Sequence, residues 1–111
     1  MAQHECKIRG DADALVAHLD AQVIRGSVTA NLEERSDQRI GDARMLVRTY
    51  ERYSALGGNR LSLNVAVLAV GTELAISAMT AGGSQAMFWK VNTFGEEAFL
   101  AKAVEALESF S

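Results

Sequence analysis

The sequence LSLNVAVLAVGTELAISA, residues 61–78, decides the fold class. Apolar residues occupy every second position from Leu61 to Ala69, with small or polar residues between the first four of them. This alternation is typical of a β-strand with one buried face. Gly71-Thr72 then interrupts the pattern, and a second alternating segment follows at residues 74–78. Because a two-residue connection is too short for a crossover, the two segments predict an antiparallel hairpin.

Further alternating segments extend the pattern from Ser27 to about Val91. The chain has no proline, so glycine or polar residues must separate these segments, and the nine glycines fall between them. Short connections predict a five-strand meander, preceded by a strand that carries Cys6 and Ile8 on one face. The expected strands cover residues 4–9, 28–33, 43–54, 61–69, 74–78 and 85–91, with a turn at residues 36–42.

Amphipathic helices are expected on either side of the meander. Residues 12–25 place apolar side chains at three- and four-residue spacing, and Asp11 and Gly26 suit the two ends of this helix. A second helix is expected to open at Thr93, because Thr93 and Glu96 match a capping box. The apolar positions are Ala12, Leu15, Val16, Leu19 and Val23 in the first helix, and Phe99, Leu100, Ala103, Val104, Leu107 and Phe110 in the second.

These elements predict a single α+β domain over residues 1–111, in the order strand, helix, five-strand antiparallel meander, helix. Both helices are expected on one face of a single curved sheet, with the other face toward water or a partner. This order resembles the TATA-binding-protein-like and helix-grip topologies, in which a curved antiparallel sheet wraps the last helix. Those folds host many unrelated functions, so the resemblance concerns topology alone.

Four short motifs resemble a small bacterial family of uncharacterised proteins. This resemblance extends over nearly the whole chain and implies no activity, cofactor or catalytic residue. The motifs are Tyr50-Glu51-Arg52-Tyr53-Ser54, Gly57-Gly58-Asn59-Arg60, Gly82-Gly83-Ser84-Gln85-Ala86 and Asn92-Thr93-Phe94-Gly95-Glu96-Glu97.

Composition indicates a soluble, cytoplasmic protein. The 111 residues are 49% apolar, which is enough for one core, but no segment approaches the roughly 18 apolar residues of a membrane span. The N-terminal residues lack the basic and apolar regions of a signal peptide. Cys6 is the only cysteine, so an internal disulfide is excluded and a reducing compartment is expected, with Cys6 as a buried, unreactive thiol.

Charge is distributed in three blocks, although the total is only −3. Residues 1–34 and 61–111 each carry a net charge of −3, whereas residues 35–60 carry +3 and all their basic side chains are arginines. Alternation puts four residues of the strand at 43–54 on one face, which we assign to the open side of the sheet together with Arg60. Those four are Arg44, Arg48, Tyr50 and Arg52.

Guanidinium groups that flank a tyrosine suit the binding of a phosphate, a carboxylate or a stacked base. The alternative is a solvated lattice in which Glu33, Glu51 and Glu73 pair with these arginines. The acidic total argues against nucleic acid as the partner, because affinity for nucleic acid depends on neutralising phosphates.

Catalytic chemistry finds no support in the sequence. His4 stands near the terminus and His18 on the flank of a helix, so neither is positioned as a base beside a nucleophile, and they form no metal-binding pair. Glu96 and Glu97 are adjacent and point in different directions from a helix, which makes them a poor acid/base pair. We therefore expect no catalytic residue, metal or cofactor.

Trp89 supports the preferred functional hypothesis. The strand expected at residues 85–91 is apolar on both faces, so one face needs cover from another molecule. We expect a non-enzymatic homo-oligomer or partner-binding module that buries Trp89, Met87 and Leu46, with no membrane partner.

Two other hypotheses remain open. One is the binding or conversion of a small anionic ligand in a cavity between the sheet and the last helix. The weaker one is RNA binding across the arginine face. The ligand-orienting residues would be Arg48, Tyr50, Arg52 and either Arg60 or Lys90.

Overall fold

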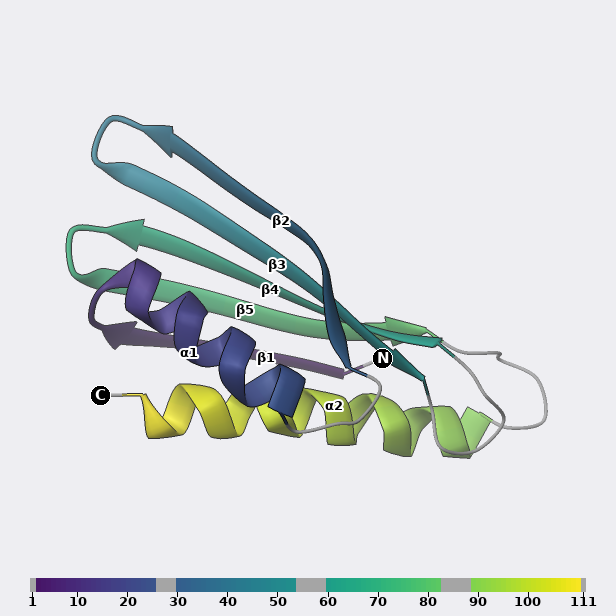
Figure 1. Ribbon diagram of the computed structural model, residues 1–111. Coiled ribbons are helices and arrows are strands. Elements are labelled where there is room, and N and C mark those ends of the chain that lie inside the picture. Colours follow the sequence, from purple (N-terminus) through teal and green to yellow (C-terminus); the bar gives the residue numbers. More distant parts are fainter. Residues whose placement is uncertain (1, 26–29, 54–59, 83–88, 111) are drawn as a thin grey trace.

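A computed structural model describes residues 2–25, 30–53, 60–82 and 89–110, without the side chains of residues 2 and 89–96. Within these residues, five strands form one antiparallel sheet and two helices pack on it (Figure 1). The elements along the chain are β1 (Ala2–Arg9), α1 (Ala12–Arg25), β2 (Asn31–Ile40), β3 (Ala43–Tyr53), β4 (Arg60–Val70), β5 (Glu73–Gly82) and α2 (Trp89–Ser109).

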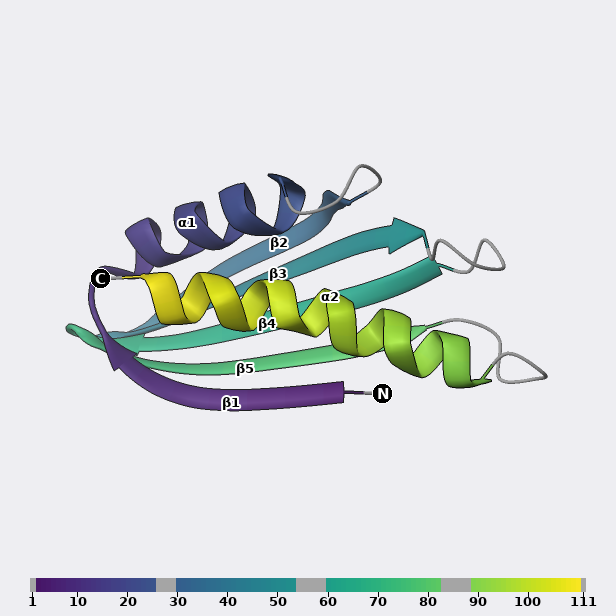
Figure 2. The same cartoon turned by 90° about the horizontal axis from the view of Figure 1, so that it is seen from below.

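The strands lie in the spatial order β1-β5-β4-β3-β2. Strands β2 to β5 pair consecutively, and β1 pairs with β5 at one edge of the sheet. The connection from β1 to β2 passes through α1, and α1 and α2 lie side by side on one face of the curved sheet (Figure 2). The predicted α+β class, with a single antiparallel sheet and both helices on one face, is confirmed.

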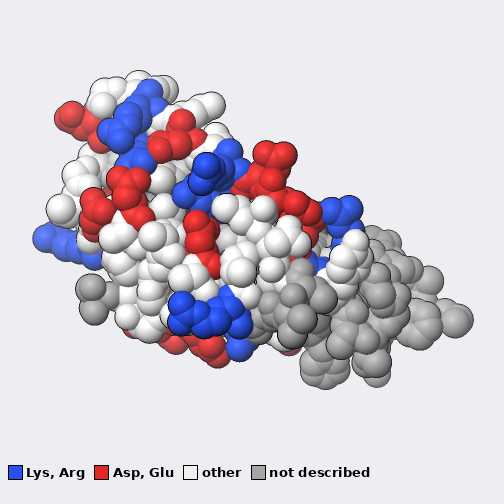
Figure 3. All heavy atoms as spheres, viewed as in Figure 1, with Lys and Arg blue, Asp and Glu red and all other residues white. Residues whose placement is uncertain are grey.

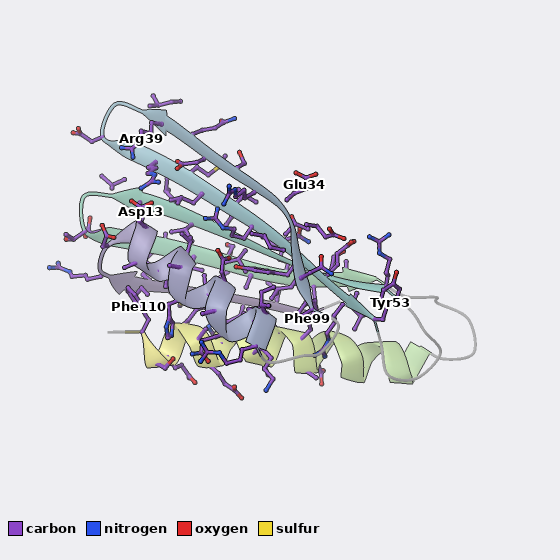
Figure 4. All side chains as sticks on the ribbon, in the orientation of Figure 1. Asp13, Glu34, Arg39, Tyr53, Phe99 and Phe110 are labelled. Carbon is purple, nitrogen blue, oxygen red and sulfur yellow. The ribbon has the colours of Figure 1, made fainter. Side chains whose placement is uncertain are left out.

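The core lies between the helices and the covered face of the sheet (Figure 4). The alternation in β4 predicts the buried face correctly, because its odd-numbered residues from Leu61 to Ala69 are buried. The five predicted apolar residues of α1 are buried as well. Among the described side chains of α2, from residue 97 onward, the buried ones are Phe99, Leu100, Ala103, Ala106 and Leu107. Val104 is half-buried, as is Phe110, which follows the helix.

The predicted strand at residues 85–91 is wrong where the structure describes it. Helix α2 already begins at Trp89, so residues 89–91 are helical, and residues 85–88 lie outside the described residues. Thr93 consequently lies inside α2 and does not cap its start. A short run in which odd- and even-numbered positions are both apolar fits a helix as well as a strand, which explains the error. The described meander has four strands, and β1 completes the five-strand sheet.

Strand β2 extends further along the chain than predicted. It continues to Ile40, so the turn is reduced to Gly41-Asp42. Polar side chains on both faces of β2 conceal its alternation in the sequence. The register with β3 shifts between Leu32 and Glu34, which leaves Glu33 as an extra residue in this edge strand.

Candidate functional site

The sheet face opposite the helices, called the open face below, has an apolar middle. The cross-strand register places Leu68 of β4 between Met45 of β3 and Ala75 of β5. Leu68 is 50% exposed and Met45 is 41% exposed, although both belong to inner strands. The patch, called the apolar centre below, consists of Ala43, Met45 and Val47 of β3, Ala66, Leu68 and Val70 of β4, and Ala75 of β5.

Polar side chains border the apolar centre on the open face. Toward the β1 edge, the Ser77 hydroxyl donates a hydrogen bond of 3.0 Å to the Glu5 carboxylate. Farther along the inner strands, Thr49 Oγ1 donates to Asn64 Oδ1 at 2.8 Å. Two shallow hollows lie between Lys7 and the apolar centre. An apolar middle with a polar rim is the usual anatomy of a protein interface.

Arg60, one of the predicted site residues, lies on the open face among acidic side chains. Its guanidinium group binds Glu51, and its Nη2 lies 3.4 Å from Glu33 Oε1. A hydrogen bond between the two carboxyl groups raises the pKa of Glu33 and lowers the pKa of Glu51. Arg60 therefore pairs with Glu33 and Glu51, as expected if arginines and glutamates form a solvated lattice of ion pairs.

The covered face of β2 and β3 meets an acidic flank of α1 (Figures 3 and 4). Asp13 lies in the first turn of α1, and Arg44 of β3 binds its carboxylate through both terminal nitrogens, at 2.9 and 2.7 Å. The Nε of Arg44 donates to Asp37 Oδ1 of β2 at 2.9 Å, and its Nη2 also binds Asp37. All three nitrogens of Arg44 are thus engaged, and this ion pair network ties α1 to the β2–β3 hairpin.

Arg48 and Tyr50 lie deeper on the same face and share Asp20 as their partner. The Nε of Arg48 lies 3.5 Å from Asp20 Oδ1, and the Tyr50 hydroxyl donates to that same oxygen. Arg48 is 9% exposed and Tyr50 is fully buried. Burial, reinforced by the bond to Asp20, raises the pKa of Tyr50, so its phenol stays protonated. Within the described residues, the Arg48 Nε has no acceptor in hydrogen-bonding geometry.

The assignment of Arg44, Arg48 and Tyr50 to the open face is therefore wrong. Alternation shows which residues share a face but does not show which face the helices cover. The acidic residues of α1 indicate in the sequence which face the helix covers. Asp13 and Asp20 are seven residues apart, which puts them on one side of the helix, where they can pair with arginines.

The remaining predicted site residues lie in three different places. Arg52 also lies on the covered face, with its guanidinium carbon 4.6 Å from the centroid of the Phe99 ring of α2. Arg60 lies on the open face, opposite Tyr53. Trp89 is the first residue of α2, and its side chain lies outside the described part. The structure does not bring the six residues of the prediction together.

Comparison with protein families covers the complete sequence. Residues 1–111 match the model of a family of unknown function, DUF6054. The chain belongs to this family. DUF6054 membership confirms the resemblance to an uncharacterised family and assigns no activity to either face. A comparison with curated proteins gives no match. In this DUF6054 protein, none of the described helices is long and apolar enough to cross a membrane.

The carboxylates around Arg44 predict acid sensitivity of this DUF6054 protein. Hydrogen bonds from Arg44 lower the pKa values of Asp13 and Asp37 below the usual 3.8. A carboxylate whose pKa is lower in the folded state stabilises the protein above its unfolded pKa, and this contribution disappears as the pH falls through the folded value. We expect the free energy of unfolding, measured with urea, to decrease below about pH 4.

Replacing Arg44 with glutamine should flatten this pH dependence, because both carboxylates lose the donor that lowers their pKa. The matched control is Arg9→Gln, which removes an exposed arginine from β1. Urea unfolding from pH 7 to pH 2 should give the same slope for Arg9→Gln as for the natural protein. An equally steep slope for Arg44→Gln would contradict the assignment.

Proposed function

We propose that the protein is a non-enzymatic module that self-associates, with the open face of one copy packed on the open face of a second. The apolar centre carries this proposal, because the helices bury the opposite face and leave Leu68 and its neighbours accessible. Soluble monomers rarely expose contiguous apolar patches larger than a few hundred Å². A second copy would remove this patch from water.

The size of the open face supports the proposal. Strands β3 and β4 have 11 residues each and β5 has 10. With strands about 4.8 Å apart and about 3.4 Å per residue, a five-strand sheet presents on the order of 800 Å². A standard stable interface buries about 800 Å² on each partner. Two sheets that pack face to face would form a closed two-fold dimer, in which the same patch serves both copies.

The proposed interface differs in its residues from the one expected from the sequence. Leu46 is only 1% exposed and lies on the covered face, and Trp89 begins α2. In the proposal, the apolar residues buried between the two copies are instead Met45, Leu68 and Val70. RNA binding across the arginines loses its main support, since Arg48 and Tyr50 are buried beneath the helices.

Substitution of Leu68 with lysine tests the interface at its middle. We expect the natural protein to show twice its chain mass of 11.9 kDa by light scattering after size-exclusion chromatography at micromolar concentration. Leu68→Lys should be monomeric, with at least about 100-fold weaker association, because a buried unpaired ammonium group is strongly unfavourable. Since Leu68 is half exposed in the single chain, the circular dichroism spectrum of Leu68→Lys should match that of the natural protein.

The matched control is Ala101→Lys, which adds the same charge at an exposed position of α2. This variant should remain dimeric, because α2 lies on the opposite side of the sheet. A natural protein that is monomeric at these concentrations would contradict the proposal. Persistence of the dimer in Leu68→Lys would exclude the open face as its interface.

A further inference from the structure

A hollow of about 310 Å³ lies on the other side of the sheet, between α1 and the β2–β3 hairpin. It is independent of the proposed dimer interface, because the open face lies on the opposite side of these strands. Asp13 reaches it from α1, and the hairpin contributes most of its wall (Figure 4). Its lining residues are Asp13, Arg35, Ser36, Asp37, Arg44, Leu46 and Arg48.

The two acidic side chains of this hollow are both bound by Arg44. Each oxygen of Asp13 and each oxygen of Asp37 accepts a hydrogen bond from Arg44. Each nitrogen of the Arg44 guanidinium group donates to at least one of these carboxylates. Within the described residues, neither carboxylate forms an ion pair with Arg35 or Arg48.

Arg35 and Arg48 remain as a pair of like charges in the same hollow. The register places them directly opposite each other on β2 and β3, an arrangement that is unfavourable for two like charges. Arg48 is nine-tenths buried, and its Nε has no hydrogen-bond acceptor among the described residues. Asp20 is the counterion of Arg48, with its Oδ1 3.5 Å from that nitrogen, but the pair lacks hydrogen-bonding geometry. No ion pair joins Arg35 to a carboxylate in the described part of the chain.

We propose that Arg35 and Arg48 bind the phosphate group of a small molecule in this hollow. Guanidinium groups match the oxygens of a phosphate with paired, charge-assisted hydrogen bonds. The charged side chains that line the hollow, three arginines and two aspartates, carry a net charge of +1, which favours an anion. The volume is at the lower limit of small-molecule sites, so it suits inorganic phosphate or a short phosphate ester and excludes a large cofactor.

Inorganic phosphate and glycerol phosphate are the probes for the test. Either compound should raise the melting temperature of the natural protein by roughly 4 °C or more at about five times its Kd, relative to chloride at equal ionic strength. Titration calorimetry gives the affinity of each. Tighter binding of inorganic phosphate would identify the free ion as the ligand, and tighter binding of glycerol phosphate would identify a phosphate ester.

Arg35→Gln and Arg39→Gln form a matched pair of variants. Both residues are exposed on β2 and separated by four positions, but Arg39 does not line the hollow. Arg35→Gln should bind phosphate at least about tenfold more weakly, whereas Arg39→Gln should bind it as the natural protein does. Equal weakening in both variants, or the absence of any phosphate effect on the natural protein, would overturn the proposal.

Discussion

Replacing Asp20 with alanine is expected to lower the free energy of unfolding by about 3 kcal/mol. Asp20 is the partner of Arg48, which is 9% exposed, and it accepts the hydroxyl of the fully buried Tyr50. The variant leaves a buried cation without its counterion and a buried hydroxyl without its acceptor. Both losses fall on the folded state, because water solvates these groups in the unfolded chain. Urea unfolding at pH 7 measures the effect.

Two further variants separate the charge effect from a general loss of packing. Asp13→Ala removes a carboxylate from the same flank of α1, but Asp13 is well exposed, so its cost should be clearly smaller than that of Asp20→Ala. Adding Arg48→Met to Asp20→Ala should recover most of the lost stability, because the uncompensated charge is removed. A double variant as unstable as Asp20→Ala would show that the ion pair is not the cause.

Substitution of Gly82 with alanine is the second change with a large expected effect. Gly82 ends β5 with a φ of +136°, opposite Leu61 of β4. An added Cβ would press against the carbonyl oxygen of Arg60 and lie 3.0 Å from the Leu61 Cα. These contacts are with backbone, so the β4–β5 pair must separate locally. The expected cost is about 3 kcal/mol, combining overpacking with unfavourable φ.

Gly41→Ala is the control for the contribution of φ alone. Gly41 has a φ of +57°, but no atom lies within 4 Å of an added Cβ there. Its cost should be about 1 kcal/mol. Thermal or urea unfolding compares the two variants. If Gly82→Ala proved no worse than Gly41→Ala, β5 would not approach β4 as closely at this end as the structure indicates.

Local patterns predict most of this fold, because burial on one face produces a regular period. The alternation in β4 and the apolar stripe of α1 belong to elements with one covered face, and both predictions are confirmed. Strand β2 contradicts the expected boundaries because it lies at an edge and carries polar side chains on both faces. Residues 89–91 are apolar without a period, so the sequence could not distinguish strand from helix there.

The residues of the candidate site are harder to predict from the sequence than the fold is, because the site depends on which face of the sheet the helices cover. Arg48 and Tyr50 were correctly grouped on one face, and that face is buried. The pairing of Arg44 with Asp13 joins residues 31 positions apart, which local patterns do not show. The same uncertainty hides the apolar centre, since Met45 lies on the opposite face of β3 from Arg48 and Tyr50.

The edge strand β2 limits how this protein can assemble. An unpaired strand edge is a template on which further chains can add and extend a continuous fibre. In β2, the extra residue Glu33 breaks the regular spacing of the edge, and Glu34, Arg35, Asp37 and Arg39 add charges of both signs. Docking of another strand there would misalign its amides and bury charge. Addition of another strand at the β2 edge of the sheet is thereby opposed.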